Sequence, residues 1–299
     1  MLNLTGDTTK YQTKKSLENK MTPWLFLMPF LLAYTIFFAI PAIYSLVLSF
    51  STYSGYGPVK WVGLENYAKL LQYPTFWLVI GNTLFYLLTL VIPVIAVSFG
   101  LAVLINSTVI KHKSFFKAGF FLPQITASVA AILVWRVMLG TNTGVINVLL
   151  GTKIPFLDDF QLMKWSIVVV VAWRAIGWFM VIFLSGLTAI PEDVIEAATI
   201  DGANTLKKLF YITIPLMKPT FLFAFFTCSV TTFKIYNEPN LLVGSGQVAP
   251  FDVAPIMNLV TTNIANGNFG MASATGWLMF LMIFILSMFQ FKLLKEDGD

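Results

Sequence analysis

The sequence predicts an all-α membrane protein with six transmembrane helices, and its composition and the length of its apolar runs carry this prediction. Of its 299 residues, 57% are hydrophobic and 11% are charged, and the mean hydropathy is +0.79. A soluble globular protein has about 45–50% apolar and about 25% charged residues. The apolar residues form long runs instead of alternating with polar ones, which excludes barrel strands and favours helices. The composition also excludes a soluble enzyme, a disordered protein and a nucleic-acid-binding protein.

Six apolar runs reach or approach the roughly 20 residues that each crossing needs. They are residues 23–50, 76–105, 118–139, 165–187, a fifth run that begins after Pro219 and is interrupted by Lys234, and 271–291. We expect Pro29 and Pro41 to bend the first run, because proline removes a helical hydrogen bond. The predicted domains are a polar tail at 1–20, a six-helix domain at 21–295 with an inner loop at 189–219, and a second tail at 296–299.

The distribution of lysine and arginine predicts the orientation. With the N-terminus inside, 12 of these residues fall in inner segments, 4 in outer loops and 3 within the runs, which agrees with the positive-inside rule. Six crossings then place both termini in the cytoplasm, whereas five or seven would put the C-terminal lysines outside. Cys228 has no partner for a disulfide, and the single His112 is expected to be a solvated loop residue, so the sequence predicts no metal site.

The inner loop at 189–219 has the pattern of a helix, a turn and a second helix. Pro191 suits the first turn of a helix, and the two acidic residues after it complement the helix dipole. Gly202 is the expected end of this helix, and Asn204 or Thr205 can cap the second one, which the prolines at 215 and 219 would break. Periodicity leaves two interpretations open: an amphipathic hairpin packed under the bundle, or a docking element for a cytosolic partner.

The same loop resembles the EAA loop of ABC importer permeases. Glu196-Ala197-Ala198 is followed by three residues and Gly202, and nine residues later by Ile212-x-Ile214-Pro215, where the family usually has leucine at the position of Ile214. The rest of the chain resembles the sugar-importer permeases of the maltose type. The segments that carry this resemblance are Trp61–Tyr67, Phe76-Trp77, Asn82-Thr83-Leu84, Phe120–Pro123, Trp135 and Gly144–Asn147.

This resemblance implies the membrane-spanning permease of a binding-protein-dependent importer, with the type I ABC importer fold, in a bacterial or archaeal cytoplasmic membrane. Its partners would be a second homologous permease, two ATPases that carry ATP and Mg²⁺, and an extracytoplasmic sugar-binding protein, while the chain itself would be no enzyme and hold no cofactor. The outer loops at 51–75, 140–164 and 237–270 would receive the binding protein, or would serve only as connections. The implied coupling residues are Glu192, Glu196, Ala197, Ala198, Asp201 and Gly202.

Charged residues inside apolar runs are costly in a bilayer and mark transport pathways. Arg174 and Lys234 lie at similar expected depth, without an acidic partner in a neighbouring run, whereas Arg136 is close enough to the end of its run to reach water. Aromatic planes and hydrogen-bonding groups suit a sugar, and two cations would suit an acidic sugar or a phosphorylated polyol. The alternative is that these are ordinary helix-contact residues. The predicted pathway residues are Trp173, Arg174, Trp178, Thr231, Thr232, Lys234, Tyr236 and Asn237.

The fifth run carries a polar stripe if it continues as one helix. Thr227, Thr231, Lys234 and Glu238 then fall on one face, because residues three and four positions apart share a face of a helix. A hydrophobic run with polar interruptions is also a pointer to a transport site.

Motifs of other functional classes are missing from the sequence. There is no G-x4-G-K-[ST] phosphate loop, and no H-E-x-x-H or G-x-S-x-G, so ATP hydrolysis is expected on partner subunits. An ion- or proton-coupled secondary carrier is the alternative function, but no paired carboxylates that would form a proton relay lie within the runs. An intramembrane enzyme is a third class, and no nucleophile–base pair supports it.

Overall fold

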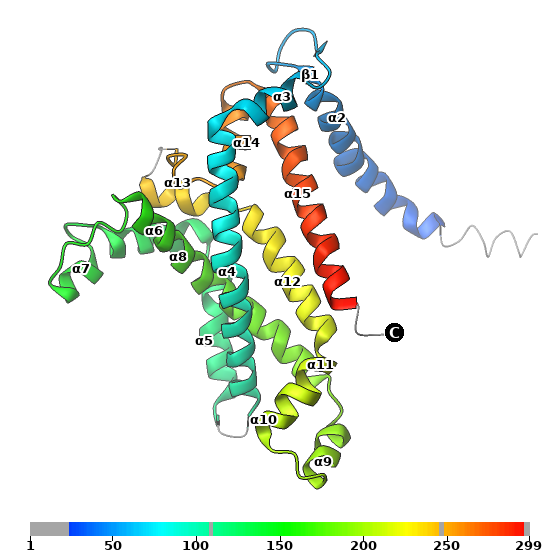
Figure 1. Ribbon diagram of the computed structural model, residues 1–299, viewed down its shortest axis with the longest axis vertical. Coiled ribbons are helices and arrows are strands. Elements are labelled where there is room, and N and C mark those ends of the chain that lie inside the picture. Colours follow the sequence, from blue (N-terminus) through cyan, green and yellow to red (C-terminus); the bar gives the residue numbers. More distant parts are fainter. Residues whose placement is uncertain (1–23, 108–109, 245–247, 296–299) are drawn as a thin grey trace, which may run out of the picture.

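Figure 1 shows the computed structural model, which describes residues 24–107, 110–244 and 248–295. The predicted tails at 1–20 and 296–299 lie outside the described residues, as does the expected start of the first run at residue 23. The described part is built of helices and one short antiparallel pair of strands, β1 (Ser51–Thr52) with β2 (Lys60–Trp61).

Within the described residues, four helices are long and apolar enough to cross a membrane: Trp24–Ser49, α4 (Pro74–Asn106), α8 (Phe160–Thr188) and α15 (Phe269–Lys295). Two further candidates are bent pairs. Helices α5 (Lys113–Ile125) and α6 (Ser128–Leu139) meet at 95°, and the helical segment Thr205–Leu216 meets α12 (Lys218–Phe233) at 68°. The predicted all-α membrane bundle is confirmed, and counting each bent pair as one crossing gives up to six crossings.

The first helix, Trp24–Ser49, stands apart from the bundle. It approaches α15 at its C-terminal end and diverges from it toward its N-terminal end (Figure 1). Apart from Leu48 and Ser49, none of its described residues is buried. Exposed apolar surface of this extent must be covered in the working protein, so lipid or another chain contacts most of this helix.

A π-helical turn precedes the proline in each of two Ile-Pro pairs. Residues Thr35–Ala39 form a π-helical turn, η1, in which the amide of Ile40 donates to the carbonyl of Thr35, just before Pro41. Residues Leu209–Thr213 form a second π-helical turn, η2, in which the amide of Ile214 donates to the carbonyl of Leu209, just before Pro215. A proline ring clashes with the carbonyl four residues before it, and a π turn is a known way to absorb such an irregularity. The helices therefore continue through both prolines.

The bundle core lies between α4, α8 and α12. Phe99, Phe183 and Phe221 come from these three helices, and their ring centroids lie 4.8–5.5 Å apart. Helix α5 packs on α8 where Gly177 has no side chain, because a Cβ there would overlap the carbonyl oxygen of Phe120. Such a close approach of two backbones is typical of small residues between membrane helices.

The third run, expected at 118–139, is not one continuous helix. The helix begins earlier, at Lys113, and breaks between Ile125 and Ser128 with the 95° bend. Thr126 has extended backbone angles, φ −69° and ψ 140°. Pro123 lacks the amide that would bond to the carbonyl four residues earlier, which weakens the last turn of α5. Three polar residues, Gln124, Thr126 and Ser128, lie at the break within a largely apolar run, and the high mean hydropathy of the whole run hides it.

Two asparagines of the resembling segments hold the loops at the end of the bundle near α3 (Glu65–Gln72) and α14 (Ile256–Ala265), the upper end in Figure 1. The side-chain amide of Asn66 donates to the carbonyls of Ser49 and Ser51, both at 2.9 Å. The amide of Asn82 donates at 2.8 and 3.0 Å to two carbonyls of the segment before α14. Both asparagines are buried, and buried polar groups are stable only when hydrogen-bonded. These residues are therefore structural clamps.

A third asparagine of the resembling segments, Asn147, holds the loop around the short helix α7 (Val145–Leu150). Its amide donates to the carbonyls of Gly140, Thr141 and Ile154, at 2.8–3.2 Å. Its side-chain oxygen accepts from the backbone amide of Ile154 at 3.0 Å. One side chain thus closes this loop.

Candidate functional site

A polar cavity of about 520 Å³ lies between α8, α12, the short helix α13 (Asn237–Val243) and the break between α5 and α6. Seven of the eight predicted pathway residues line it. They are Arg174, Trp178, Thr231, Thr232, Lys234, Tyr236 and Asn237. The structure brings these residues together, and their role in transport stays a prediction.

The cavity forms because the fifth run is not one helix. Helix α12 ends at Phe233, Lys234 caps it, and α13 begins three residues further on. The predicted continuous stripe is therefore wrong beyond Phe233. The break nevertheless returns Glu238 to the same cavity as Thr231, because the chain turns at Lys234 and Tyr236 instead of rising past them.

The threonines in this region use their hydroxyl protons within the helix. The hydroxyl of Thr231 donates to the carbonyls of Thr227 and Cys228, both at 2.9 Å, and the hydroxyl of Thr232 donates to that of Cys228 at 2.8 Å. A hydroxyl that donates to the backbone keeps free lone pairs. Thr231 is exposed and Thr232 is buried, so Thr231 can accept a hydrogen bond from an occupant of the cavity.

Two charged residues of the cavity wall form an ion pair. The Nη1 atom of Arg174 on α8 lies 3.2 Å from the Oε1 atom of Glu238 on α13, and their side chains are 18% and 12% exposed. The expectation that Arg174 has no acidic partner was therefore wrong, because Glu238 reaches it once α12 has ended. Arg174 Nε is buried and makes no hydrogen bond to any described residue. Lys234 is exposed and has no ion pair within the described part of the chain.

Helix α13 is itself held in place by one side chain. The amide of Asn240 donates to the carbonyl of Tyr236 at 2.7 Å. Its side-chain oxygen accepts from the backbone amide of Ala249 and from the side-chain amide of Asn258, at 2.9 and 3.0 Å. Asn240 therefore fixes the position from which Glu238 faces Arg174.

Sequence reasoning missed the contribution of the third run to the cavity. Gln124 and Ser128 line it from the two sides of the α5–α6 break. In one continuous helix these two residues, four positions apart, would share a face, but the sequence does not show that this face borders the fifth run. The available signals were Pro123 and the polar residues Gln124, Thr126 and Ser128 that follow it in a largely apolar run.

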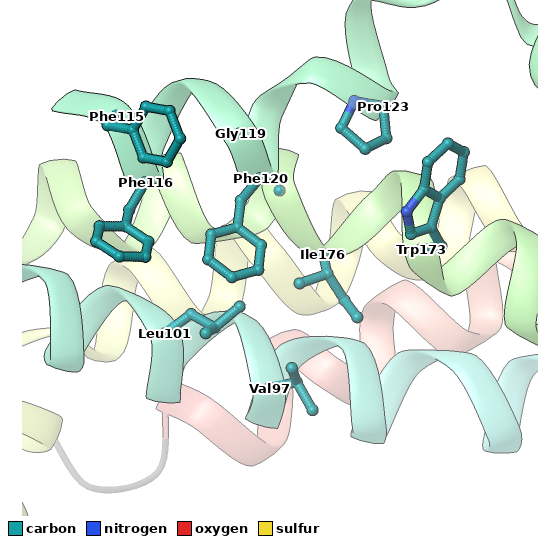
Figure 2. A pocket seen from close by; sticks show the side chains of 10 residues that line it. Val97, Leu101, Phe115, Phe116, Gly119, Phe120, Pro123, Trp173 and Ile176 are labelled. Carbon is teal, nitrogen blue, oxygen red and sulfur yellow. The ribbon is translucent and has the colours of Figure 1, made fainter. Parts of the chain in front are cut away.

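Trp173 lines a different cavity. This second space, of about 560 Å³, lies between α4, α5 and α8 and has apolar walls. Figure 2 shows Phe120, Ile176 and Leu101 facing one another within it. Five positions of helix turn Trp173 about 140° away from Trp178, so the two rings cannot share one site. Trp178 instead stacks on Phe121, with ring centroids 6.2 Å apart.

The predicted helix, turn and second helix are present in the inner loop. Helix α9 (Glu192–Ile200) begins after Pro191, and Gly202 follows it with a φ of +78°. The amide of Ala203 donates to the carbonyl of Ala198 at 2.9 Å, and the amide of Gly202 donates to that of Thr199 at 3.1 Å. This pair of bonds is the Schellman motif, whose left-handed position favours glycine.

The second helical segment, Thr205–Leu216, consists of α10 (Thr205–Lys208), η2 and α11 (Ile214–Leu216). The side chain of Asn204 accepts from the amide of Lys207 at 2.8 Å, so Asn204 is the cap. The expected break before the fifth run is present and lies between the two prolines, while Pro215 itself lies within α11, after the π turn η2. A single break occurs at Met217, two residues before Pro219.

The tip of the helix pair formed by α9 and Thr205–Leu216 is exposed. Among the residues implied as coupling residues, Ala198 is buried and the others are exposed: Glu192, Glu196, Ala197, Asp201 and Gly202. Two apolar side chains nearby are also open, Ile200 at 87% and Tyr211 at 81% exposure. In Figure 1, α9 lies at the opposite end of the molecule from α3 and α14.

A bundle of apolar helices around a partly polar, aromatic-lined cavity is typical of a multi-pass membrane transport protein. The chain belongs to the family described as binding-protein-dependent transport system inner membrane component, which matches residues 19–295. This membership confirms the resemblance to binding-protein-dependent importer permeases that the sequence motifs predicted.

Known relatives and solved structures agree with this family. The chain is 31% identical over 282 residues to the arabinooligosaccharides transport system permease protein AraP of Bacillus subtilis, covering 92% of this chain and 89% of that protein. Its fold is similar to a subunit of a bacterial ABC transporter involved in the import of the acidic polysaccharide alginate, with a TM-score of 0.83, 19% identity and coverage of 96% and 100%. A structure of the bacterial alginate transporter in complex with an alginate pentasaccharide-bound periplasmic protein matches with a TM-score of 0.81, 19% identity and coverage of 95% and 98%.

Proposed function

We propose that this chain is the membrane-spanning permease subunit of an ATP-driven importer that takes up an oligosaccharide delivered by an extracytoplasmic binding protein. The family and the oligosaccharide transport named for its relative support this function. The observation that carries it is the cavity, where the rings of Trp178 and Tyr236 are 42% and 37% exposed beside hydrogen-bonding groups. Sugar rings have apolar faces that stack on aromatic planes and hydroxyl edges that bond to polar groups.

The proposed assembly contains a second, homologous permease, two ATPase subunits and the binding protein. ATP and Mg²⁺ belong to the ATPases, and no step of nucleotide chemistry falls to this chain. A second permease would complete the pathway and cover apolar surface such as that of the Trp24–Ser49 helix, which is exposed here. Lipid would cover the remainder.

The helix pair around α9 is proposed as the coupling element, with Glu192, Glu196, Ala197, Ala198, Asp201 and Gly202 at or beside the contact. The exposed Ile200 and Tyr211 support a docking role, because bare apolar side chains at a tip mark an interaction surface. Closure of the ATPases would push on this tip and rock the bundle, provided that the contacts differ between the two end states. The positive-inside bias supports a cytoplasmic position for this end and for both termini.

The test is reconstitution of the chain with its ATPases and second permease in proteoliposomes, in the presence of the binding protein. We expect ATP hydrolysis to rise when sugar-loaded binding protein is added, and sugar to accumulate only with ATP. An Ile200→Glu variant should lose co-purification of the ATPases, because a charge would replace a buried apolar contact. A Leu149→Glu variant is the matched control, since Leu149 is equally bare, at 80% exposure, on α7. Uptake by the purified chain alone, without ATP, would establish the secondary carrier instead.

A further inference from the structure

We propose that the polar cavity is built for a sugar that carries a carboxylate, with Lys234 as the group that receives that carboxylate. This inference rests on the proposed function and adds the charge class of the substrate. It starts from the charged groups on the cavity wall, which are Arg174, Lys234 and Glu238. Their formal sum is one positive charge.

The positive charge belongs to Lys234. Arg174 and Glu238 compensate each other at 3.2 Å, whereas Lys234 has no ion pair within the described residues. An uncompensated charge among membrane helices is costly, and such residues pair with one another or line a water-filled pathway. A carboxylate on the substrate would offset this charge, and a neutral sugar would leave it as it is. The cavity therefore discriminates in favour of an anion.

Arg174 gives a second reason to expect an anionic substrate. Its Nη1 atom is used by Glu238, but its Nε atom is buried without a hydrogen-bond partner among the described residues. A buried donor without a partner destabilises the arrangement that leaves it unpaired. Arginine presents its donors as a planar fork that fits a carboxylate, so an anion that draws this side chain further into the cavity would satisfy the orphan donor.

The balance of charge also selects between classes of anion. A carboxylate carries one negative charge, which matches the single excess positive charge on the wall. A phosphomonoester carries between one and two negative charges at neutral pH, and its second charge would have no counter-ion here. The exposed rings of Trp178 and Tyr236 and the free acceptor of Thr231 then accommodate the sugar ring and its hydroxyls. At about 520 Å³, the volume is within the roughly 300–1,000 Å³ of small-ligand sites.

The experiment compares charged and neutral versions of one saccharide. The reconstituted complex with its binding protein is given four sets of sugars in separate assays. These are di- and trisaccharides of galacturonate, glucuronate and mannuronate, the same saccharides after reduction of their carboxylates, neutral arabino-oligosaccharides, and sugar phosphates. We expect a uronate saccharide to stimulate ATP hydrolysis and its carboxyl-reduced form to need at least tenfold higher concentration. Full stimulation by a neutral saccharide, or by sugar phosphates alone, overturns the inference and leaves the importer function intact. Failure of every sugar to stimulate ATP hydrolysis counts against the proposed function itself.

Variants of Lys234 separate its charge from its bulk. Lys234→Gln should lower the uptake rate of the uronate saccharide about tenfold, the effect of losing a charged hydrogen bond. Lys234→Arg keeps the charge and should restore most of the rate. Because the binding protein is unaltered in both variants, the change reports on the permease. Equal uptake by Lys234→Gln and the wild type, with both assembled to the same extent, overturns the assignment.

Discussion

The ion pair between Arg174 and Glu238 predicts a measurable coupling in stability. Its atoms lie 3.2 Å apart and the side chains are 18% and 12% exposed. A Glu238→Gln change leaves the guanidinium without a counter-ion in a largely buried place. Breaking a buried pair in this way is unfavourable by about 3–5 kcal/mol, and we expect about 3 kcal/mol because the cavity gives both side chains some contact with water. At about 2–4 °C per kcal/mol, the Tm should fall by about 6–12 °C.

A double-mutant cycle tests this value. The Tm of the purified complex is measured for Glu238→Gln, Arg174→Gln and the double variant. The double variant removes both charges at once, so its loss should be smaller than the sum of the single losses by about 2 kcal/mol. Glu65→Gln is the control, because Glu65 pairs with Lys69 at 2.7 Å on the exposed surface, where such pairs contribute at most about 1 kcal/mol. Additive losses in the cycle would refute the reasoning that this pair is energetically coupled.

Two further predictions concern glycines. Gly202→Ala places a side chain at a φ of +78° with no neighbouring atom within 4 Å, so only backbone strain of roughly 1–2 kcal/mol results. Stimulated ATP hydrolysis should fall in this variant, whereas the control Gly151→Ala, equally strained at a φ of +64°, should leave it unchanged. Equal effects of the two changes on ATP hydrolysis would contradict a coupling role for Gly202. Gly177→Ala should prevent assembly, measured as yield of the purified complex, because its Cβ overlaps the carbonyl of Phe120, whereas Gly100→Ala meets open space and should assemble normally.

The long helices could be predicted from the sequence because the bilayer makes apolar length the dominant signal. The fourth run, expected at 165–187, lies within α8 (Phe160–Thr188), and the second run lies within α4. The turn at Gly202 was equally predictable, since a left-handed position after a helix selects glycine by local sterics alone. Signals of this kind depend only on neighbouring residues, so one sequence suffices to read them.

The breaks and the ion pair could not be predicted in the same way. The α5–α6 bend falls at Thr126 and Ser128, and such short polar side chains also occur inside continuous membrane helices. The end of α12 falls inside a stripe with perfect helical spacing. Arg174 and Glu238 are 64 positions apart, and nothing in either local sequence indicates the other. Tertiary packing decides these features, and Asn240 is an example: its hydrogen bonds to Tyr236, Ala249 and Asn258 determine where α13 lies.

The places where prediction failed are the places where the candidate site lies, and membrane physics explains why. Backbone groups freed by a broken helix have no water to bond in lipid, so breaks persist only where they are buried in protein or line a water-filled cavity. Two separate breaks, at the α5–α6 junction and after α12, deliver Gln124, Ser128, Lys234 and Tyr236 to one cavity. This convergence supports the cavity as the transport site independently of what any relative of the chain transports.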